Sequence, residues 1–350
     1  MTPNNGKNTL QLGSVVIDPP TLLAPMEAIT DAPFRQLIRS LGGCGLVVTE
    51  FVHSRALAEQ TAKAVRMADI QHDAHPVSIQ IYGRDPILMA RSALLAQELG
   101  ADIVDINMGC PSKAVTSGCA GVALMREPQL ARTIVREVMR VMRVPLTVKM
   151  RLGWDAQSRT APELAWMCQE EGVSAVTIHG RTRADLYRGH ADWQAIGEVK
   201  ARVRIPVIGN GDVCSVPDAL ELLRRSGADG VMAGRGVLKN PWLLLQISQA
   251  LKGESVMHPS LEVRKAHLLR YFQIIQEQIP HPPAALGKMK KVAGIFTEGL
   301  AFAADFRDTI LHARSVDEAL AAVEAYFARL DREATTLGHD PYQRLTLEGM

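Results

Sequence analysis

The chain has 350 residues, of which 47% are hydrophobic, enough to bury the core of one large domain and a small second one. Its formal net charge of +2 is too small to indicate a nucleic-acid partner by itself. No apolar stretch approaches the ~20 residues of a membrane-spanning helix or the apolar centre of a secretion signal. We therefore expect no membrane partner and a cytoplasmic location. Five cysteines without a C-x-x-C pair predict reduced thiols and no metal site.

The first predicted element is a short hairpin at residues 10–17, where apolar and polar residues alternate around Gly13. Eight short apolar strands follow, separated by segments in which apolar residues recur at helical spacing. The predicted strands cover residues 21–24, 45–49, 77–80, 103–106, 146–148, 175–178, 206–208 and 230–233.

Strands that alternate with helices are typical of a parallel sheet, and eight such units predict a (β/α)₈ TIM barrel. A doubly wound sheet is the alternative, but it would leave some strand ends unused at its edges. We assign residues 20–252 to the barrel and residues 1–19 to an N-terminal extension whose hairpin plugs the closed end of the barrel.

The part of the chain after the barrel is predicted to be helical, because strand signals stop near residues 253–259. Amphipathic patterns predict helices at residues 261–279, 285–300 and 316–332. The last of these begins with a capping box in which Glu318 follows Ser315 by three residues. Residues 260–335 are therefore a predicted helical domain, and residues 336–350 a tail.

Each predicted strand of the barrel ends in residues that can bind or react. Barrel enzymes build their active sites at the C-terminal ends of the strands, so these residues are expected to meet at one face. In chain order they are Pro25 and Met26; Glu50; Gln80; Asn107 and Cys110; Lys149 and Arg151; His179; Asn210, Gly211 and Asp212; Gly234 and Arg235.

The last two strand ends predict a phosphate site. Gly211 and Gly234 allow close approach of the backbone to a ligand, and barrels commonly bind phosphate between the loops after strands seven and eight. Arg235 adds a fixed positive charge and a fork of donors that suits phosphate. The alternative is that both glycines serve only as turn residues.

Lys149, His179 and Gln80 carry cationic or donor groups that suit the electron-rich pyrimidine side of a flavin. Taken singly, a solvated lysine or a core histidine would be an equally good interpretation. Together with a phosphate site on the neighbouring strands, they predict bound flavin mononucleotide (FMN).

Cys110 could be a nucleophile, an acid, a metal ligand or an inert residue. No ligand partner is spaced near it, and no histidine lies in its motif. A thiol is mostly protonated at neutral pH, so it can give a proton to a carbanion-like carbon as hydride arrives next to it. Beside a flavin, this predicts reduction or oxidation of a polarised C=C bond.

Several motifs between Thr21 and Phe327 resemble those of the bacterial, FMN-dependent tRNA-dihydrouridine synthases, which reduce uridine to dihydrouridine in the tRNA D-loop. The order and spacing of the motifs are specific, although several are common individually. They are Ala-Pro-Met-Glu-Ala-Ile-Thr-Asp at 24–31, Thr-Glu-Phe at 49–51, Gln80, Asp-Ile-Asn-Met-Gly-Cys-Pro-Ser-Lys at 105–113, Val-Lys-Met-Arg-Leu-Gly-Trp at 148–154, Ile-His-Gly-Arg-Thr at 178–182, Asn-Gly-Asp at 210–212 and Gly-Arg at 234–235.

The resemblance implies a TIM barrel with tightly bound FMN, NADPH as the reductant, a helical domain that binds tRNA, and a monomer. It makes Cys110 the proton donor to C5 of the uracil while reduced FMN delivers hydride to C6. FMN contacts fall to Pro25, Met26, Glu27, Gln80, Lys149, His179, Asn210, Gly211, Asp212, Gly234 and Arg235.

The substrate contacts implied by the resemblance involve both domains. Asn107 and Arg151 would orient the flipped-out base, and Arg181 would face the RNA. Lys288 and Lys291 in the helical domain would contact phosphates, although acids balance bases there and a solvated face is the alternative.

Two other interpretations compete with this one, of which the first is an enzyme and the second is not. The first is an FMN-dependent oxidoreductase of a free pyrimidine or another enone, which would leave the helical domain without a task. The second is a non-catalytic RNA-binding protein on the same scaffold, which fits poorly with intact Cys110, Lys149 and His179.

The choice of D-loop uridine stays open. Thr-Glu-Phe-Val and Arg-Leu-Gly-Trp-Asp resemble the branch that acts on position 16, whereas the N-terminal hairpin and Asn-Met-Gly-Cys-Pro resemble the branch that acts on position 17. One departure from the family pattern is Ala28, which stands where the family usually places glycine.

Overall fold

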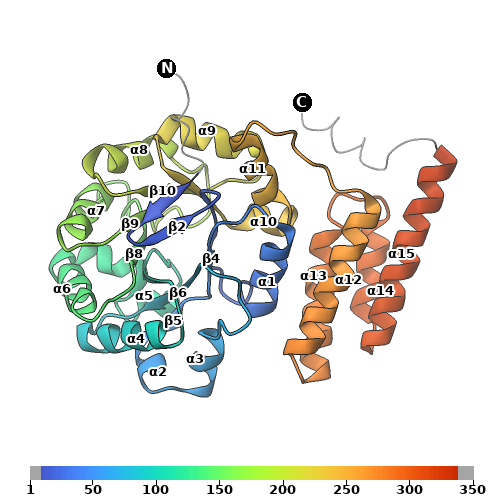
Figure 1. The fold of residues 1–350 in the computed structure, drawn as a ribbon, viewed down its shortest axis with the longest axis horizontal. Helices are drawn as coiled ribbons and strands as arrows, with labels where there is room; N and C mark the ends of the chain where they lie inside the picture. The colour runs from blue at the N-terminus through green and yellow to red at the C-terminus, as the bar shows by residue number, and fades with distance from the viewer. Residues whose placement is uncertain (1–8, 338–350) are drawn as a thin grey trace. The chain divides into compact units, whose positions relative to one another are not determined.

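A computed structural model describes residues 9–337. The polar segment before residue 9 and most of the expected tail at 336–350 lie outside the described residues. The chain divides into two compact units, one of Met1–Val237 with Trp242–Val256 and one of Leu238–Pro241 with Met257–Met350. The first unit contains the barrel and the second contains the C-terminal helices (Figure 1).

The barrel is formed by parallel strands that run in the order β3, β11, β10, β9, β8, β7, β6 and β4. The Leu22–Leu46 bridge joins β3 to the chain just before β4 and brings the two ends of the sheet together, so the predicted TIM barrel is confirmed. The strands are β1 Leu10–Leu12, β2 Val15–Ile17, β3 Thr21–Leu23, β4 Val47–Val48, β5 Val52–His53, β6 Val77–Tyr82, β7 Ile103–Met108, β8 Leu146–Arg151, β9 Ala175–His179, β10 Val207–Asn210 and β11 Gly230–Ala233.

Helices surround the strands in a ring, as Figure 1 shows. Many begin at a side chain that accepts a backbone N–H, as Asp31, Asp85 and Ser215 do for α1, α4 and α9. The helices of the barrel unit are α1 Ala32–Leu41, α2 Ser54–Ala58, α3 Ala62–Met67, α4 Pro86–Glu98, α5 Lys113–Thr116, the 3₁₀ turn Gly121–Arg126, α6 Pro128–Met139, α7 Ala161–Glu170, α8 Trp193–Arg202, α9 Val216–Ser226, α10 Arg235–Lys239, which extends past Val237, and α11 Leu243–Leu251.

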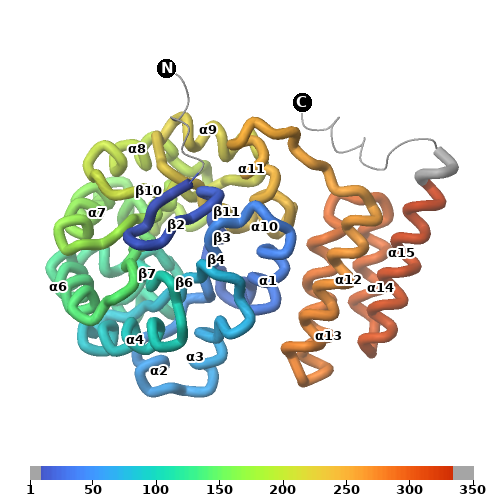
Figure 2. Tube along the Cα trace, viewed as in Figure 1, coloured from blue at the N-terminus to red at the C-terminus, as the bar shows by residue number. Residues whose placement is uncertain are grey.

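The N-terminal hairpin of β1 and β2 lies across the middle of the ring of strands (Figure 2). Leu10, Leu12 and Ile17 are buried there in one cluster with Ile103 and Ala175, which are the first residues of β7 and β9. Because these are strand starts, the hairpin covers the N-terminal end of the barrel and leaves the C-terminal end for a site.

Polar residues that were expected in loops lie on strands instead. The sequence pattern ends the strands of β7 and β8 at the last apolar residue, whereas the structure extends them to Met108 and Arg151. Asn107 and Lys149 are therefore paired neighbours in the sheet. A side chain on a paired strand is held more rigidly than one on a loop, which favours a precise site.

The helical unit contains α12 Leu261–Gln278, α13 Pro282–Phe296, α14 Ala303–His312 and α15 Val316–Leu337. The sequence analysis did not predict α14, because only Ala303, Phe306 and Ile310 on it are buried. Three apolar contacts on so short a segment give too weak a helical pattern. Phe306 stacks on Tyr326 of α15 with ring centroids 4.4 Å apart, so packing within the unit stabilises this helix.

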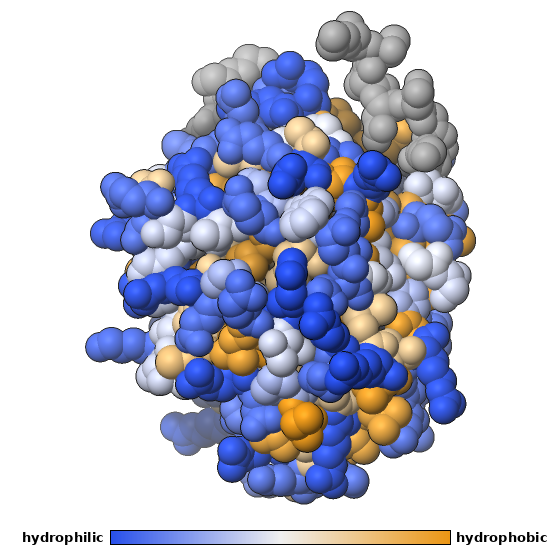
Figure 3. Space-filling view, turned by 90° about the vertical axis from the view of Figure 1, so that its left-hand side faces the viewer, coloured by the Kyte–Doolittle hydropathy of each residue, from blue (hydrophilic) through white to orange (hydrophobic). Residues whose placement is uncertain are grey.

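Among the described residues, no helix is long and apolar enough to span a membrane. Figure 3 shows the face of the barrel unit that is on the left in Figure 1, where hydrophilic side chains predominate and hydrophobic ones form small separate groups. Such scattered apolar groups are normal on a protein surface and do not indicate a binding face.

The loop after β3 carries backbone strain at Ala28, whose φ is +57°. The left-handed region disfavours any side chain with a Cβ and favours glycine. This conformation gives a physical reason for the glycine expected at this position. We expect Ala28→Gly to stabilise the barrel by about 0.5–1 kcal/mol, measured as a rise of about 2 °C in the thermal unfolding midpoint.

The matched control for Ala28→Gly is Ala90→Gly in the middle of α4. There the same substitution removes a good helix former, so we expect a loss of about 0.5–1 kcal/mol. Destabilisation by both variants would contradict the assignment of strain to Ala28.

Candidate active site

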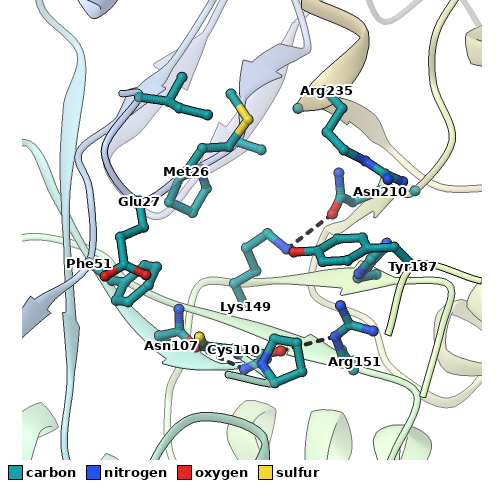
Figure 4. Close-up of a pocket in the computed structure, with 18 of the residues that line it drawn as sticks. Met26, Glu27, Phe51, Asn107, Cys110, Lys149, Arg151, Tyr187, Asn210 and Arg235 are labelled. Carbon is teal, nitrogen blue, oxygen red and sulfur yellow. Dashed lines mark hydrogen bonds between the residues drawn. The ribbon is translucent and has the colours of Figure 1, made fainter. Parts of the chain in front are cut away.

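The C-terminal ends of the strands surround a cavity of about 570 Å³, a volume typical of small-molecule and cofactor sites. Figure 4 shows Cys110 beside Asn107 toward one end of the view and Arg235 toward the other, with Lys149 between them. The predicted site residues that line the cavity are Pro25, Met26, Glu27, Asn107, Cys110, Lys149, Arg151, His179, Asn210, Gly211, Asp212, Gly234 and Arg235.

Lys149 is a partly buried cation in the wall of the cavity. Its Nζ donates a hydrogen bond to Asn210 Oδ1 at 3.0 Å, and Asn210 Nδ2 in turn donates to the carbonyl oxygen of Met232 at 2.8 Å. Burial, together with the positive charge of Arg151, lowers the pKa of Lys149 to about 8. The ammonium is therefore retained at neutral pH and is lost on the alkaline side of pH 8.

His179 lies at the end of β9 and is held in the neutral form. Its burial lowers its pKa well below the usual value, and the charges of Lys149 and Arg151 add to the effect. A neutral imidazole carries one donor and one acceptor. His179 can therefore offer a hydrogen bond in the cavity without adding charge.

The Cys110 loop is tied down on both sides. The backbone N–H groups of Gly109 and Cys110 donate to Asn107 Oδ1 at 3.0 and 2.8 Å, and Arg151 Nε donates to the carbonyl oxygen of Gly109 at 3.0 Å. Cys110 Sγ lies 3.4 Å from Ser112 Oγ. The thiol is thus fixed at the edge of the cavity, where it is only partly buried.

Tyr187 also lines the cavity, and the sequence analysis missed it. The guanidinium groups of Arg151 and Arg235 lie 5.4 and 4.6 Å from the centre of its ring. Its neighbour Leu186 has a φ of +53°, and the Leu186 carbonyl accepts from Arg151 Nη1 at 2.8 Å. The available sequence signal was an aromatic residue in a long loop after a barrel strand.

The end of the cavity near Arg235 is shaped by Gly211. Its φ is +120°, and a Cβ placed there would lie 2.8 Å from the Ala191 Cβ, so no larger residue fits without a shift. Burial acts against ionisation of Asp212, yet its hydrogen bonds from Arg181 and Ala191 and the charge of Arg235 hold its pKa below the usual value. Asp212 is therefore an anion 3.5 Å from Arg235.

Arg181, which the sequence analysis predicted to face the RNA, has its partners within the barrel unit. Arg181 is 2% exposed and does not line the cavity. Both of its terminal nitrogens donate to Asp212 at 2.7 Å, and it also donates to the carbonyl oxygens of Arg188 and Gly189. Its role in the described structure is to hold the loops after β9 and β10 together.

Gln80, Lys288 and Lys291 also lie outside the lining of the cavity. Gln80 is completely buried and bonded to Asn107 and Asp105. Lys288 and Lys291 belong to α13 of the helical unit. Within residues 9–337, no group of three His, Cys, Asp or Glu residues could hold a metal ion.

Residues 22–331 match the dihydrouridine synthase (Dus) family. The chain belongs to the dihydrouridine synthase family. It is 40% identical to a probable tRNA-dihydrouridine synthase of Rickettsia bellii over 86% of this chain and 92% of the relative. It is 37% identical to tRNA-dihydrouridine synthase B of Xanthomonas axonopodis over 92% of this chain and 96% of the relative. The predicted family and enzyme class are thereby confirmed.

Solved structures with a similar fold include a 2-naphthoyl-CoA reductase, with a TM-score of 0.56, 12% identity and coverage of 70% of this chain. A histamine dehydrogenase from Rhizobium has a TM-score of 0.55, 11% identity and coverage of 76% of this chain. The match spans only 52% and 50% of those two chains. At such low identity these similarities support the barrel fold alone.

Proposed function

We propose that this protein reduces the C5=C6 bond of uridines in the D-loop of tRNA to give 5,6-dihydrouridine. The observation that carries the proposal is that one cavity of a dihydrouridine synthase barrel brings together Cys110, Lys149 and Arg235. Relatives named tRNA-dihydrouridine synthase align with nearly the whole chain. The tRNA substrate favours action in the cytoplasm, and we propose that the chain acts as a monomer.

The residues of the cavity fit FMN. Arg235 and the small residues Gly211 and Gly234 suit its phosphate, while Lys149 and neutral His179 suit the polar edge of its ring. Met26 lines the same cavity. When bound, FMN supplies the hydride that adds to C6 of the uracil, with NADPH as the source of reducing equivalents.

Cys110 is the proposed acid. As the hydride adds to C6, the Cys110 S–H bond breaks and its proton forms the new C5–H bond. The thiolate that remains takes a proton from water before the next turnover. For each uridine one NADPH is oxidised to NADP⁺, so electrons and protons balance.

Asn107 and Arg151 are the proposed contacts to the uracil ring. Arg151 uses Nε and Nη1 for backbone carbonyls, so its Nη2 group is the part available to a uracil oxygen in the cavity. Withdrawing the uridine from its stack costs a few kcal/mol. We assign the remaining contacts, including phosphates near Lys288 and Lys291, to the helical unit as part of the proposal.

The test of the proposed function begins with the absorbance spectrum of the purified protein, which should show bound flavin. Incubation with NADPH and unmodified tRNA, followed by nucleoside mass analysis, should show uridine that has gained two hydrogen atoms. Activity on free pyrimidines or enones but not on tRNA would favour the small-molecule oxidoreductase instead. A colourless protein that cannot take up FMN would overturn the proposed mechanism.

A further inference from the structure

A line of hydrogen bonds runs beneath the floor of the cavity to the Cys110 loop. Gln80 Nε2 donates to Asp105 Oδ2 at 2.6 Å, and Gln80 Oε1 accepts from Asn107 Nδ2 at 2.8 Å. Asn107 Oδ1 then accepts the backbone N–H groups of Gly109 and Cys110. Gln80 and Asp105 are completely or almost completely buried, so water is a poor substitute for any of these partners.

The two ends of this line have fixed and opposite hydrogen-bonding character. The backbone N–H groups of Gly109 and Cys110 can only donate. At the other end, Asp105 accepts from Gln80 through one carboxylate oxygen and from Thr147 through the other. Burial raises the pKa of Asp105 to about 6, and these two hydrogen bonds oppose the rise.

The two amides between these ends have a single orientation that satisfies every bond. The NH₂ group of Gln80 must face the carboxylate, which turns its oxygen toward Asn107. The NH₂ group of Asn107 must then face Gln80, which turns its oxygen toward the loop. Rotating either amide by half a turn would place two donors or two acceptors against each other, at a cost of about 1–3 kcal/mol per unsatisfied buried group.

We propose that Asp105 is a positioning residue that acts through Gln80 and Asn107 to hold the loop of Cys110 in its reactive arrangement. Its consequence for turnover rests on the proposed function of Cys110. Asp105 does not line the cavity, and Thr147 Oγ1 donates to its second oxygen at 2.5 Å, which fixes the carboxylate at the start of the line.

Asp105→Asn tests this dependence, because it keeps the shape of the side chain and changes only its hydrogen-bonding character. With Thr147 still donating to the amide oxygen, the new NH₂ group faces the NH₂ group of Gln80. If the Gln80 amide rotates, its NH₂ group faces the NH₂ group of Asn107. If the Asn107 amide rotates in turn, its NH₂ group faces the backbone N–H of Cys110. While Thr147 donates, no arrangement of Gln80 and Asn107 satisfies both ends. Turning the new amide itself would make the Thr147 hydroxyl an acceptor and take away the partner that its proton has in the original protein, so a donor of the group loses its partner in either case.

The double variant Asp105→Asn/Gln80→Glu restores the pattern. A carboxylate at position 80 accepts from the new amide on one side and from Asn107 on the other, so the Asn107 oxygen again faces the loop. The total charge of the group is unchanged. The single variant Gln80→Glu instead sets two carboxylates against each other and should be impaired.

The experiment measures two quantities on the full-length, flavin-loaded protein. One is kcat for dihydrouridine formation, and the other is the rate at which iodoacetamide alkylates Cys110, followed by peptide mass analysis. For Asp105→Asn we expect kcat to fall about tenfold or more and alkylation of the loosened loop to rise at least about threefold. The double variant should return both quantities to within about threefold of the original protein, far from the product of the single effects.

The matched control is Asp102→Asn, the same change just before the other end of β7. Asp102 accepts from the backbone N–H of Val77 at 2.7 Å and lies far from the Cys110 loop in the sheet. This variant should leave kcat and Cys110 alkylation unchanged. Unchanged alkylation in Asp105→Asn, or a double variant as impaired as the singles, would overturn the proposal.

The same variants distinguish a failure of Asp105→Asn to fold from a failure of the proposed function. If Asp105→Asn does not fold, the double variant must fold and turn over, and an unfolded double variant would overturn the proposal. If alkylation responds as expected while kcat does not, the line of hydrogen bonds stands and the role of Cys110 in turnover is refuted.

Discussion

Cys110→Ala is expected to lower the rate of dihydrouridine formation by about 10²–10⁴-fold, the range typical of a lost general acid. The thiol lines the cavity, and its loop is fixed by Asn107 and Arg151 rather than by the sulfur itself. Removing the sulfur should therefore leave FMN and tRNA binding intact. The measurement is single-turnover reduction of tRNA, with FMN content and tRNA affinity determined on the same preparation.

The control for this variant is Cys119→Ala, which removes a second partly buried thiol nine residues further along the chain. We expect it to keep full activity, since Cys119 does not line the cavity. Cys110→Ser should stay impaired, because a hydroxyl is a much weaker acid than a thiol although it fits the same space. Near-normal turnover by Cys110→Ala would remove Cys110 from the mechanism and leave the proton to water.

The barrel and most of its cavity could be predicted from the sequence because both depend on a local pattern. A β-branched apolar run that ends in a polar residue marks a buried strand with a functional tip, and this pattern recurs along the chain. Lys149, Asn210 and Arg235 were found in this way, and all line the cavity. Strand order follows once the sheet is taken to close into a barrel, because each strand then pairs with its neighbours in the chain.

The depth of each side chain in the barrel was not predictable, because it depends on register between strands. Gln80 of β6 pairs with Asp105 of β7. Asn107 lies two residues further along β7 and pairs with Lys149 of β8. A polar residue near a strand end can therefore lie one layer below the cavity. This difference in register places Gln80 under Asn107 and not in the lining.

The path of the long loops could not be predicted from the sequence either. Tyr187 reaches the cavity because the loop after β9 is held by hydrogen bonds from Arg151 to its carbonyl oxygens and by the left-handed conformation of Leu186. Arg181 was predicted to face the RNA, because its bond to Asp212 at a different strand end could not be foreseen. Such contacts join residues far apart in sequence and leave no local pattern.

Lys149→Met is expected to weaken FMN binding and to lower turnover by about 10²-fold, the loss typical of one preorganised charge in a water-excluded site. Lys149 lies at the centre of the cavity wall, and its ammonium is held by Asn210. Reduced flavin carries negative charge, so removing the cation acts more strongly on the reduced state than on the oxidised one. The measurement is the reduction potential of the bound flavin, which should fall, together with kcat.

The pH dependence of FMN binding distinguishes a role of the Lys149 charge from a role of the Lys149 side chain in packing. Because the pKa of Lys149 is lowered to about 8 by burial and by the charge of Arg151, the cation is present below that pH and is lost above it. The dissociation constant for FMN should therefore rise between pH 7 and pH 9 in the original protein and stay flat in Lys149→Met.

Lys200→Met removes another partly buried lysine, paired with Asp229 at 2.6 Å, and should keep the original pH profile. A rise of equal size in Lys149→Met would assign the pH dependence to a different group and reduce Lys149 to a packing role.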